Sequence, residues 1–250
     1  MAVDPIHQFQ IIDLFPVVKI GHTEIAFTNS AAYMAVAVLV IMLFLIGGTA
    51  RRSLVPGRLQ SAAELSYEFV ANTIRSTAGT EGMRFFPFVF TLFMFILVVN
   101  LIGLIPYTFT VTTHIVITAT LALSVFVTVL VYGFWKNGLH FFNLFVPKGI
   151  PVYILPLIVF IEVLSFISRP ISHSVRLFAN MLAGHITLKV FASFITLLGG
   201  LGIFGIAGAT LPLALVVALT ALELLVAFLQ AYVFAILTCI YLNDAIHPGH

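Results

Sequence analysis

Long apolar runs separated by short polar stretches dominate the pattern of this 250-residue chain. A transmembrane helix needs about 20 mostly apolar residues. Runs of roughly that length predict membrane helices over residues 31–48, 85–105 and 115–135. Two longer runs follow over residues 150–198 and 205–242, with a glycine-rich turn between them. The pattern therefore predicts an all-α polytopic membrane protein with about five membrane helices.

The last two runs are too long to cross a bilayer at right angles. At 1.5 Å per residue, a helix of about 45 residues extends about 68 Å, whereas the hydrocarbon core is about 30 Å thick. Each run is either two spans or one strongly tilted or kinked helix. No turn cluster interrupts residues 160–196. We therefore expect a hairpin of two long tilted helices, with Pro170 and Pro212 as the candidate kink sites.

Residues 58–77 carry a different pattern, in which apolar and polar positions fall on opposite faces of a helix. The apolar face holds Leu59, Ala62, Ala63, Tyr67, Val70 and Ile74. The polar face holds Arg58, Glu64, Glu68, Asn72 and Arg75. This amphipathic helix either lies on the cytoplasmic membrane face or docks against a partner. We expect residues 1–30 to form an outer N-terminal segment, and residues 1–250 to form a single membrane domain.

Composition indicates that lipid is the main solvent of the chain. Hydrophobic residues make up 61% and charged residues 8%, against about 45–50% and about 25% in soluble domains. A formal net charge of +2 is too small to suggest a nucleic-acid partner, and a single cysteine, Cys239, excludes an internal disulfide. The sequence has no glycine-rich phosphate loop and no metal-ligand cluster. We therefore expect no cofactor, no bound metal and no catalytic centre for nucleotide chemistry.

Basic residues indicate the orientation in the membrane. Around the amphipathic helix and after the third span, the basic residues are Arg51, Arg52, Arg58, Arg75, Arg84, Lys136 and Lys148. The loops around Pro106 and Gly200 contain none. The positive-inside rule places the basic loops in the cytoplasm. Five spans then leave the N-terminus outside and the C-terminus in the cytoplasm.

A few polar residues interrupt the two long C-terminal runs. Arg176 lies in the segment 172–185, and a charge at the bilayer centre costs from about 2.5 to more than 10 kcal/mol. Glu162, Arg169 and Arg176 are spaced by seven, so they lie near one helical stripe. Small residues on that stripe let another helix approach Arg176 closely. A chain that keeps such a charge is expected to use it to handle ions or protons.

Further polar groups suggest two separate aqueous routes. His185 follows Arg176 by nine residues, which places it on the opposite side of the same helix. Glu223 and Gln230 are seven apart on the last helix, where a hairpin could bring Glu223 opposite His185 and Gln230 near Arg176. Histidine and a buried carboxyl both titrate within reach of neutral pH and can relay protons, whereas arginine keeps its proton.

Other intramembrane polar residues fit structural roles better. Arg169 is expected to be a structural partner of Glu162. Lys189 is expected to extend toward the far interface. Asn100 and His114 flank the second hairpin and are expected to pack helices or lie at the interface.

The segment 172–185, with Glu162 upstream and the Glu223/Gln230 pair downstream, resembles subunit a of F-type ATP synthases, in the branch of alphaproteobacteria and mitochondria. The resemblance covers nearly the whole chain. It implies a proton-translocating stator subunit of the Fo sector that stands beside a rotating ring of c subunits. Two offset aqueous half-channels would couple proton flow to rotation and ATP synthesis, with nucleotide chemistry on other subunits.

The resemblance also implies roles for individual residues. Arg176 would be the barrier to proton leakage and the partner of the ring carboxyl, with Asn180 and Gln230 beside it. His185 and Glu223 would form the outer half-channel relay. Glu162 and Asp244 would form the inner exit, for which His247 and His250 are further candidates.

Partners and location follow from the same resemblance. It implies the c-subunit ring, the b and b′ subunits of the peripheral stalk, the rest of the F1Fo complex and membrane lipids, with one copy of this chain per complex. It favours the inner membrane of a bacterial cell, with the mitochondrial inner membrane as the alternative.

Three other interpretations stay open at this point. A secondary transporter would show repeated halves with paired helix interruptions, which the sequence lacks. A purely structural subunit would tolerate loss of Arg176. A sodium-coupled version of the same machine would place its ligands mainly on the ring, although the titratable His185 favours protons.

Overall fold

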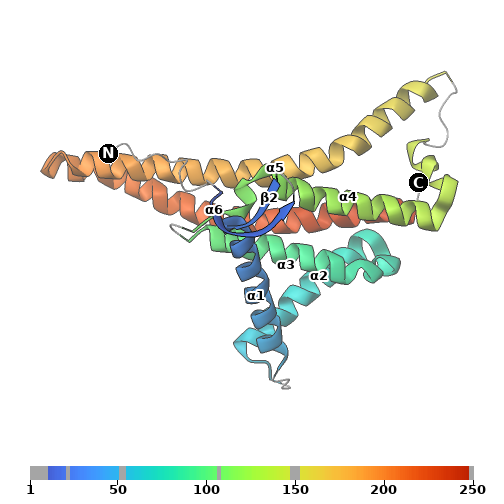
Figure 1. Ribbon diagram of the computed structural model, residues 1–250, viewed down its shortest axis with the longest axis horizontal. Coiled ribbons are helices and arrows are strands. Elements are labelled where there is room, and N and C mark those ends of the chain that lie inside the picture. Colours follow the sequence, from blue (N-terminus) through green and yellow to red (C-terminus); the bar gives the residue numbers. More distant parts are fainter. Residues whose placement is uncertain (1–10, 21–22, 51–54, 106–107, 147–152, 248–250) are drawn as a thin grey trace. The chain divides into compact units, whose positions relative to one another are not determined.

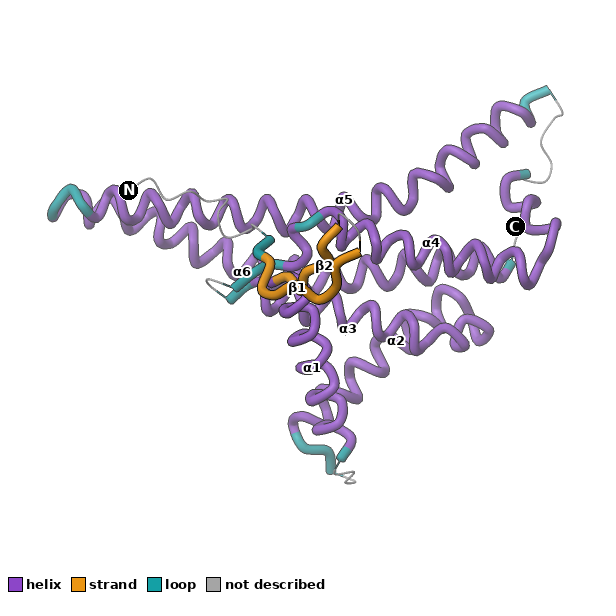
Figure 2. Tube along the Cα trace, in the orientation of Figure 1, coloured by secondary structure: helices purple, strands orange, loops and turns teal. Residues whose placement is uncertain are grey.

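The computed structural model describes residues 11–20, 23–50, 55–105, 108–146 and 153–247. Helices form almost all of it, and the two strands appear in orange in Figure 2. The elements in chain order are β1 (Asp13–Ile20), β2 (Thr23–Thr28), α1 (Asn29–Thr49), α2 (Arg58–Gly82), η2 (Met83–Phe85), α3 (Phe86–Gly103), η3 (Val111–Thr113), α4 (Ile115–Asn137), η4 (Gly138–Phe145), α5 (Leu155–Gly199) and α6 (Ile203–Ile246). Five helices are long and apolar enough to cross a membrane. The expected all-α polytopic membrane fold is confirmed.

A short β-hairpin precedes the first helix, and the sequence did not lead us to expect it. Strands β1 and β2 pair antiparallel, from Asp13 opposite Thr28 to Ile20 opposite Thr23. Asn29 ties the hairpin to α1, because its backbone N–H donates to the Ile12 carbonyl at 3.0 Å and its side-chain oxygen accepts from the Ile12 N–H at 3.2 Å. Strands of six and eight residues are too short to be distinguished by the long apolar runs that mark the membrane helices.

Helix α2 is the amphipathic helix, and one of its faces is docked inside the protein. Val70 and Ile74 are buried on that face, and the Phe69 ring lies 5.6 Å from the ring of Phe93 on α3. The opposite face exposes its charged residues. The helix begins at Arg58 and continues beyond the predicted residue 77 to Gly82, with a kink at Gly79 where φ is +67°.

Helices α5 and α6 are each continuous over their whole length, as the ribbon in Figure 1 shows. Pro170 and Pro212 lie inside these helices without ending them. The connection is a tight turn in which Gly202 has φ +80°, a conformation that glycine adopts without a steric penalty. The hairpin of two long helices is therefore present.

The described residues fall into two compact units. The first unit comprises Met1–Ile41, Phe95–His114 and Leu177–Gln230, and the second comprises Met42–Met94, Ile115–Arg176 and Ala231–His250. Four helices, α1, α3, α5 and α6, contribute one end to each unit. Arg51, Arg52, Lys148 and His250, which entered the sequence-based expectations, lie outside the described residues.

Candidate functional site

Arg176 lies on an exposed face of α5. The residues at helical spacing on that face are Ser172, Arg176, Ala179, Asn180 and Ala183, all of them exposed. Apart from Arg176 and Asn180, these side chains are small, so another helix can approach the backbone closely. The face therefore presents a guanidinium and an amide on an otherwise flat apolar surface. Gln230 on α6 is 5% exposed.

In the first unit, His185 is held by a threonine from a distant part of the chain. The Thr110 hydroxyl and His185 Nε2 are 3.3 Å apart in a hydrogen bond. Thr110 is buried, and its carbonyl accepts a hydrogen bond from the Thr113 hydroxyl at 2.6 Å. A Cβ on Gly103 would lie 2.8 Å from Thr110 Cγ2. Thr110 thus has a fixed position from which it orients the half-buried imidazole.

Glu223 packs against the residue that precedes His185. A Cβ on Gly184 would overlap Oε1 of Glu223 and lie 3.1 Å from its Cδ. Both carboxyl oxygens are buried, and neither has a hydrogen-bond partner among the described residues. The α5–α6 hairpin therefore brings Glu223 to the turn of helix that carries His185. Thr110, Gly184, His185 and Glu223 are called the His185 cluster below.

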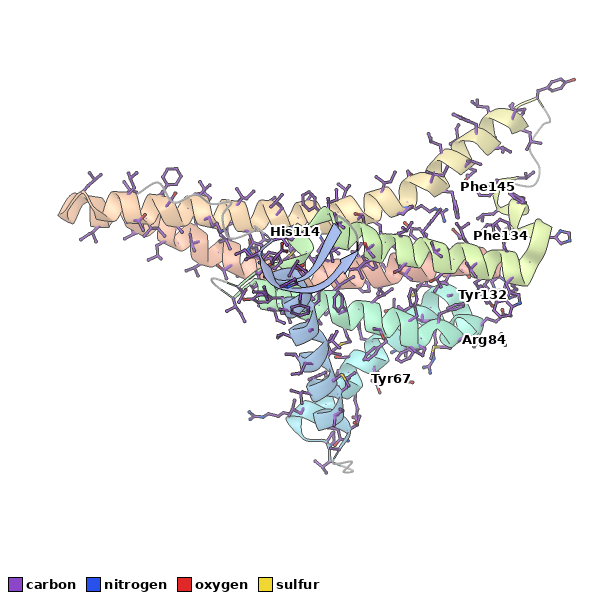
Figure 3. All side chains as sticks on the ribbon, in the orientation of Figure 1. Tyr67, Arg84, His114, Tyr132, Phe134 and Phe145 are labelled. Atoms are coloured by element: carbon purple, nitrogen blue, oxygen red, sulfur yellow. The ribbon has the colours of Figure 1, made fainter. Side chains whose placement is uncertain are left out.

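Two further polar residues of the first unit are Asn100, which is buried, and His114, which is half-buried. Asn100 is fully buried, and its Oδ1 accepts a hydrogen bond from the Thr112 hydroxyl at 3.0 Å. The ring of His114, labelled in Figure 3, stacks on Phe109 with centroids 5.0 Å apart. His114 lies between the membrane-spanning helices, and burial lowers its pKa from the ordinary 6.5, so the ring is neutral near pH 7. Both residues lie near the ends of α3 and α4 and contact neighbouring side chains there.

In the second unit, Arg169 pairs with Asp244 across the hairpin. Nη1 of Arg169 donates to Oδ2 of Asp244 at 2.7 Å. The guanidinium also lies over two aromatic rings, 5.3 Å from the centroid of Phe166 and 4.9 Å from that of Tyr241. Such cation–π contacts add to the stability of the pair. Phe166, Arg169, Tyr241 and Asp244 are called the Arg169 cluster below.

The expected pairing of Arg169 with Glu162 is wrong. Seven helical residues span about 10.5 Å along the axis, too far for a direct ion pair on one helix, whereas Asp244 faces Arg169 from α6. The half-buried Glu162 has no hydrogen bond or ion pair with any described residue. Glu162 and Asp244, grouped together from the sequence, therefore have different surroundings.

An aromatic shell supports the Arg169 cluster. The rings of Phe126 and Phe145 lie 5.1 Å and 5.4 Å from the ring of Phe166. Phe134 and Phe145, which Figure 3 labels, come from α4 and from the short helix η4 that follows it. A Cβ on Gly133 would overlap the Phe141 ring, so only glycine lets that ring approach α4. These rings hold the Phe166 ring in the position where the Arg169 guanidinium lies over it.

Several residues that the structure brings into these clusters had no role in the expectations drawn from the sequence. Thr110 and Gly184 contact His185 and Glu223 as described, and Tyr241 lies under Arg169. His173, also without a role, is buried beside Phe234. The available signals were the threonine-rich segment 108–113 and a second histidine within an apolar helix.

The arrangement combines side chains that can exchange protons. Among the residues that the structure describes, no three His, Cys, Asp or Glu side chains lie close enough together to hold a metal ion. The first unit instead combines an imidazole, a hydroxyl and a carboxyl, with Lys189 one helical turn from the imidazole. The second unit combines a carboxylate with a permanent guanidinium partner. Apart from Thr110, both clusters lie on helices that are long and apolar enough to cross a membrane.

Comparison with known proteins identifies the family. The family model described as ATP synthase A chain matches residues 31–243. The chain is 72% identical over 248 residues to the ATP synthase subunit a of Rhodopseudomonas palustris strain BisB18, covering 99% of this chain and 100% of the relative. It is 72% identical over 247 residues to the ATP synthase subunit a of Nitrobacter winogradskyi, covering 99% of each. The chain thus belongs to the subunit a family of F-type ATP synthases, multi-pass membrane proteins of the Fo sector that serve ion transport and ATP synthesis.

Proposed function

We propose that the chain provides two offset proton half-channels and the arginine that engages the carboxyl of a c-subunit ring. The observation that carries this proposal is Arg176, an exposed guanidinium on a small-residue face of a 45-residue apolar helix. A fixed cation there attracts a passing carboxylate and opposes direct proton leakage. Asn180 lies one turn further along the same face and contacts the same partner. We assign Gln230, buried on α6, to proton translocation as well.

Each unit contributes one half-channel in this proposal. His185 and Glu223 relay protons on the outer side, where Thr110 orients the imidazole and Gly184 leaves room for the carboxyl. Glu162 and Asp244 line the inner exit. The presence of one polar cluster in each unit supports two routes instead of a single continuous pore.

The distribution of basic residues supports the orientation. Of 11 lysines and arginines, nine fall in the sequence ranges of the second unit, and only Lys19 and Lys189 fall in those of the first. The positive-inside rule then predicts that the basic loops lie on the cytoplasmic side of a bacterial inner membrane. The N-terminus is periplasmic and the C-terminus is cytoplasmic. The partners of the chain are the c-ring, the b and b′ subunits and lipid, with one copy in each complex.

The decisive experiment replaces Arg176 by alanine in the whole complex in inverted membrane vesicles. We expect ATP-driven acidification to disappear while the complex still assembles. After removal of the extramembrane sector, we expect added passive proton leak. The control is Arg75→Ala on the exposed face of α2, which removes a guanidinium outside the proposed route. Normal pumping by Arg176→Ala would contradict the proposal and leave the chain a scaffold.

A sodium series tests the coupling ion. His185 in the His185 cluster favours protons, because an imidazole exchanges protons near neutral pH and sodium requires oxygen ligands. We expect ATP-driven acidification and ATP synthesis to be independent of sodium concentration. Strict dependence of both activities on sodium would show that the proposed relay carries a different ion.

A further inference from the structure

His173 is a buried histidine whose side chain makes no hydrogen bond to any residue that the structure describes. It lies on α5 in the second unit and is 5% exposed. Its ring stands edge-on to Phe234, with centroids 3.8 Å apart and planes at 80°. Neither Nδ1 nor Nε2 has a hydrogen-bond partner among the described residues. The next residue differs, because the Ser174 hydroxyl is hydrogen-bonded to that of Thr118 at 3.2 Å.

A merely structural role does not account for an imidazole in this position. A neutral imidazole always carries one N–H donor and one bare nitrogen, and burying both without partners is unfavourable. Leucine fills a similar volume with no such penalty. Replacing a buried polar group that makes no bonds with an apolar group of similar shape removes this desolvation penalty. A role in proton transfer therefore explains the presence of this histidine better than a role in packing.

Charged groups lie close to His173 on both helices of the hairpin. On α5, Arg169 precedes it by four residues and Arg176 follows it by three, both within about one turn. On α6, the ring of Tyr241 lies 6.1 Å from the imidazole, and Asp244 is held by Arg169. Two nearby guanidinium groups oppose a lasting positive charge on the ring. The imidazole can accept a proton transiently, but the nearby positive charges disfavour a long-lived imidazolium.

We propose that His173 carries protons on the cytoplasmic side of Arg176, as a further member of the inner half-channel. This proposal rests on the proposed function and adds to it a residue on the buried side of α5. A protonated carboxyl of the ring gives its proton, directly or through water, to the bare nitrogen of His173. An N–H bond forms at that nitrogen, the N–H bond at the other nitrogen breaks, and its proton goes to water on the cytoplasmic side. The carboxyl of the c-ring becomes a carboxylate, and the imidazole of His173 is neutral again. A flip of the imidazole then restores the starting positions of its N–H group and its bare nitrogen.

The test measures proton conductance of the whole complex carrying His173→Leu. Vesicles are stripped of the extramembrane sector, and passive conductance is measured under an imposed potential. We expect the complex to assemble with thermal stability equal to or above that of the parent, and conductance to fall by about tenfold or more. Parental conductance in His173→Leu would overturn the proposal.

Two further variants separate proton transfer from packing and from hydrogen bonding. His173→Gln keeps hydrogen-bonding groups but cannot pass a proton, so we expect it to conduct as poorly as His173→Leu. Phe234→Leu loosens the packing of the imidazole but keeps it, and we expect conductance to stay within about twofold of the parent, since no titrating group is lost. Parental conductance in His173→Gln, equal loss in Phe234→Leu, or failure of both His173 variants to assemble would each overturn the proposal.

Arg176→Ala, measured in the same vesicle series, distinguishes the two proposals. If Arg176→Ala keeps normal ATP-driven pumping, the proposed function fails whatever His173 does. If Arg176→Ala abolishes pumping and His173→Leu conducts like the parent, only the role of His173 fails.

Discussion

The His185 cluster and the Arg169 cluster each contain a buried or half-buried carboxyl in a membrane helix, but the two carboxyl groups differ in their hydrogen-bond and ion-pair partners. Glu223 has no hydrogen-bond partner and no fixed cation among the described residues, and it packs against the backbone at Gly184. Asp244 is paired with Arg169, whose guanidinium is supported by two aromatic rings. A carboxyl without a fixed partner can gain and lose a proton as its neighbours change. A carboxylate held by a guanidinium makes a charge-assisted hydrogen bond that ties two helices together.

This difference refines the roles of the acidic residues. Glu162, the other carboxyl proposed for the inner exit, has no ion pair with a described residue and in this respect resembles Glu223 more than Asp244. We infer that Glu162 exchanges protons at the exit, whereas Asp244 mainly fixes its geometry. In the proposed function, the clusters therefore separate proton exchange from structural pairing, although each contains a carboxyl group.

The strongest test of this comparison removes the two carboxyl charges in turn. Glu223→Gln keeps the shape of the side chain but cannot release a proton, so we expect proton-driven ATP synthesis to fall by about 100-fold. Asp244→Asn should lower synthesis by less than about tenfold, because the residue does not exchange protons itself. Both rates are measured in vesicles with matched amounts of assembled complex. Equal losses in the two variants would remove the distinction.

A second test fills the space that Glu223 occupies. Gly184→Ala places a Cβ on the carboxyl, so the side chain must move away from the turn that carries His185. We expect passive proton conductance to fall by about tenfold, since a displacement near 1 Å can misalign a transfer. Gly199→Ala is the control, because nothing lies within 4 Å of a Cβ there. Parental conductance in Gly184→Ala would show that the close packing is not required.

The membrane fold could be predicted from the sequence because its signal is local. A run of apolar residues determines a span without knowledge of its neighbours, so α5 and α6 were expected as single helices despite Pro170 and Pro212. The amphipathic α2 was visible for the same reason. The β1–β2 hairpin was missed, because short strands resemble any irregular segment when only long apolar runs are sought.

The candidate site was only partly predictable, because its contacts join distant parts of the chain. Helical spacing placed Arg176 and Asn180 on one face, and their exposure on α5 agrees with that periodicity. The pairing of Arg169 was wrong, since spacing along one helix does not reveal what the facing helix offers. The Thr110–His185 bond joins residues 75 positions apart, and no periodicity indicates such a pair.

A third test measures how strongly the Arg169 cluster ties α5 to α6. Arg169→Gln, Asp244→Asn and the double variant form a cycle, read as the midpoint temperature of thermal inactivation of the purified complex. The side chains are 22% and 26% exposed, so solvent screening should limit the coupling to about 1 kcal/mol. Each single variant should lower the midpoint, and the double variant should lower it by less than the sum. Strict additivity would mean that the ion pair contributes nothing beyond its two side chains.

The smallest expected effect lies in the first unit, at the hydroxyl that orients His185. Thr110→Val keeps the packing against Gly103 but removes the hydrogen bond to Nε2, whereas Thr110→Ser keeps the hydroxyl. At 3.3 Å this bond is long, so its loss should lower proton conductance only about two- to fivefold, in line with about 0.5–1 kcal/mol for a weak neutral hydrogen bond. Because the imidazole remains present, its contribution to the pH dependence of conductance should survive in Thr110→Val.

Recovery in Thr110→Ser would assign the effect to orientation, since serine restores the hydroxyl and not the methyl group. If Thr110→Ser instead conducted as poorly as Thr110→Val, the methyl packing of Thr110 would matter more than its hydroxyl. The His185 cluster would then depend on close packing, as the aromatic platform of the Arg169 cluster does.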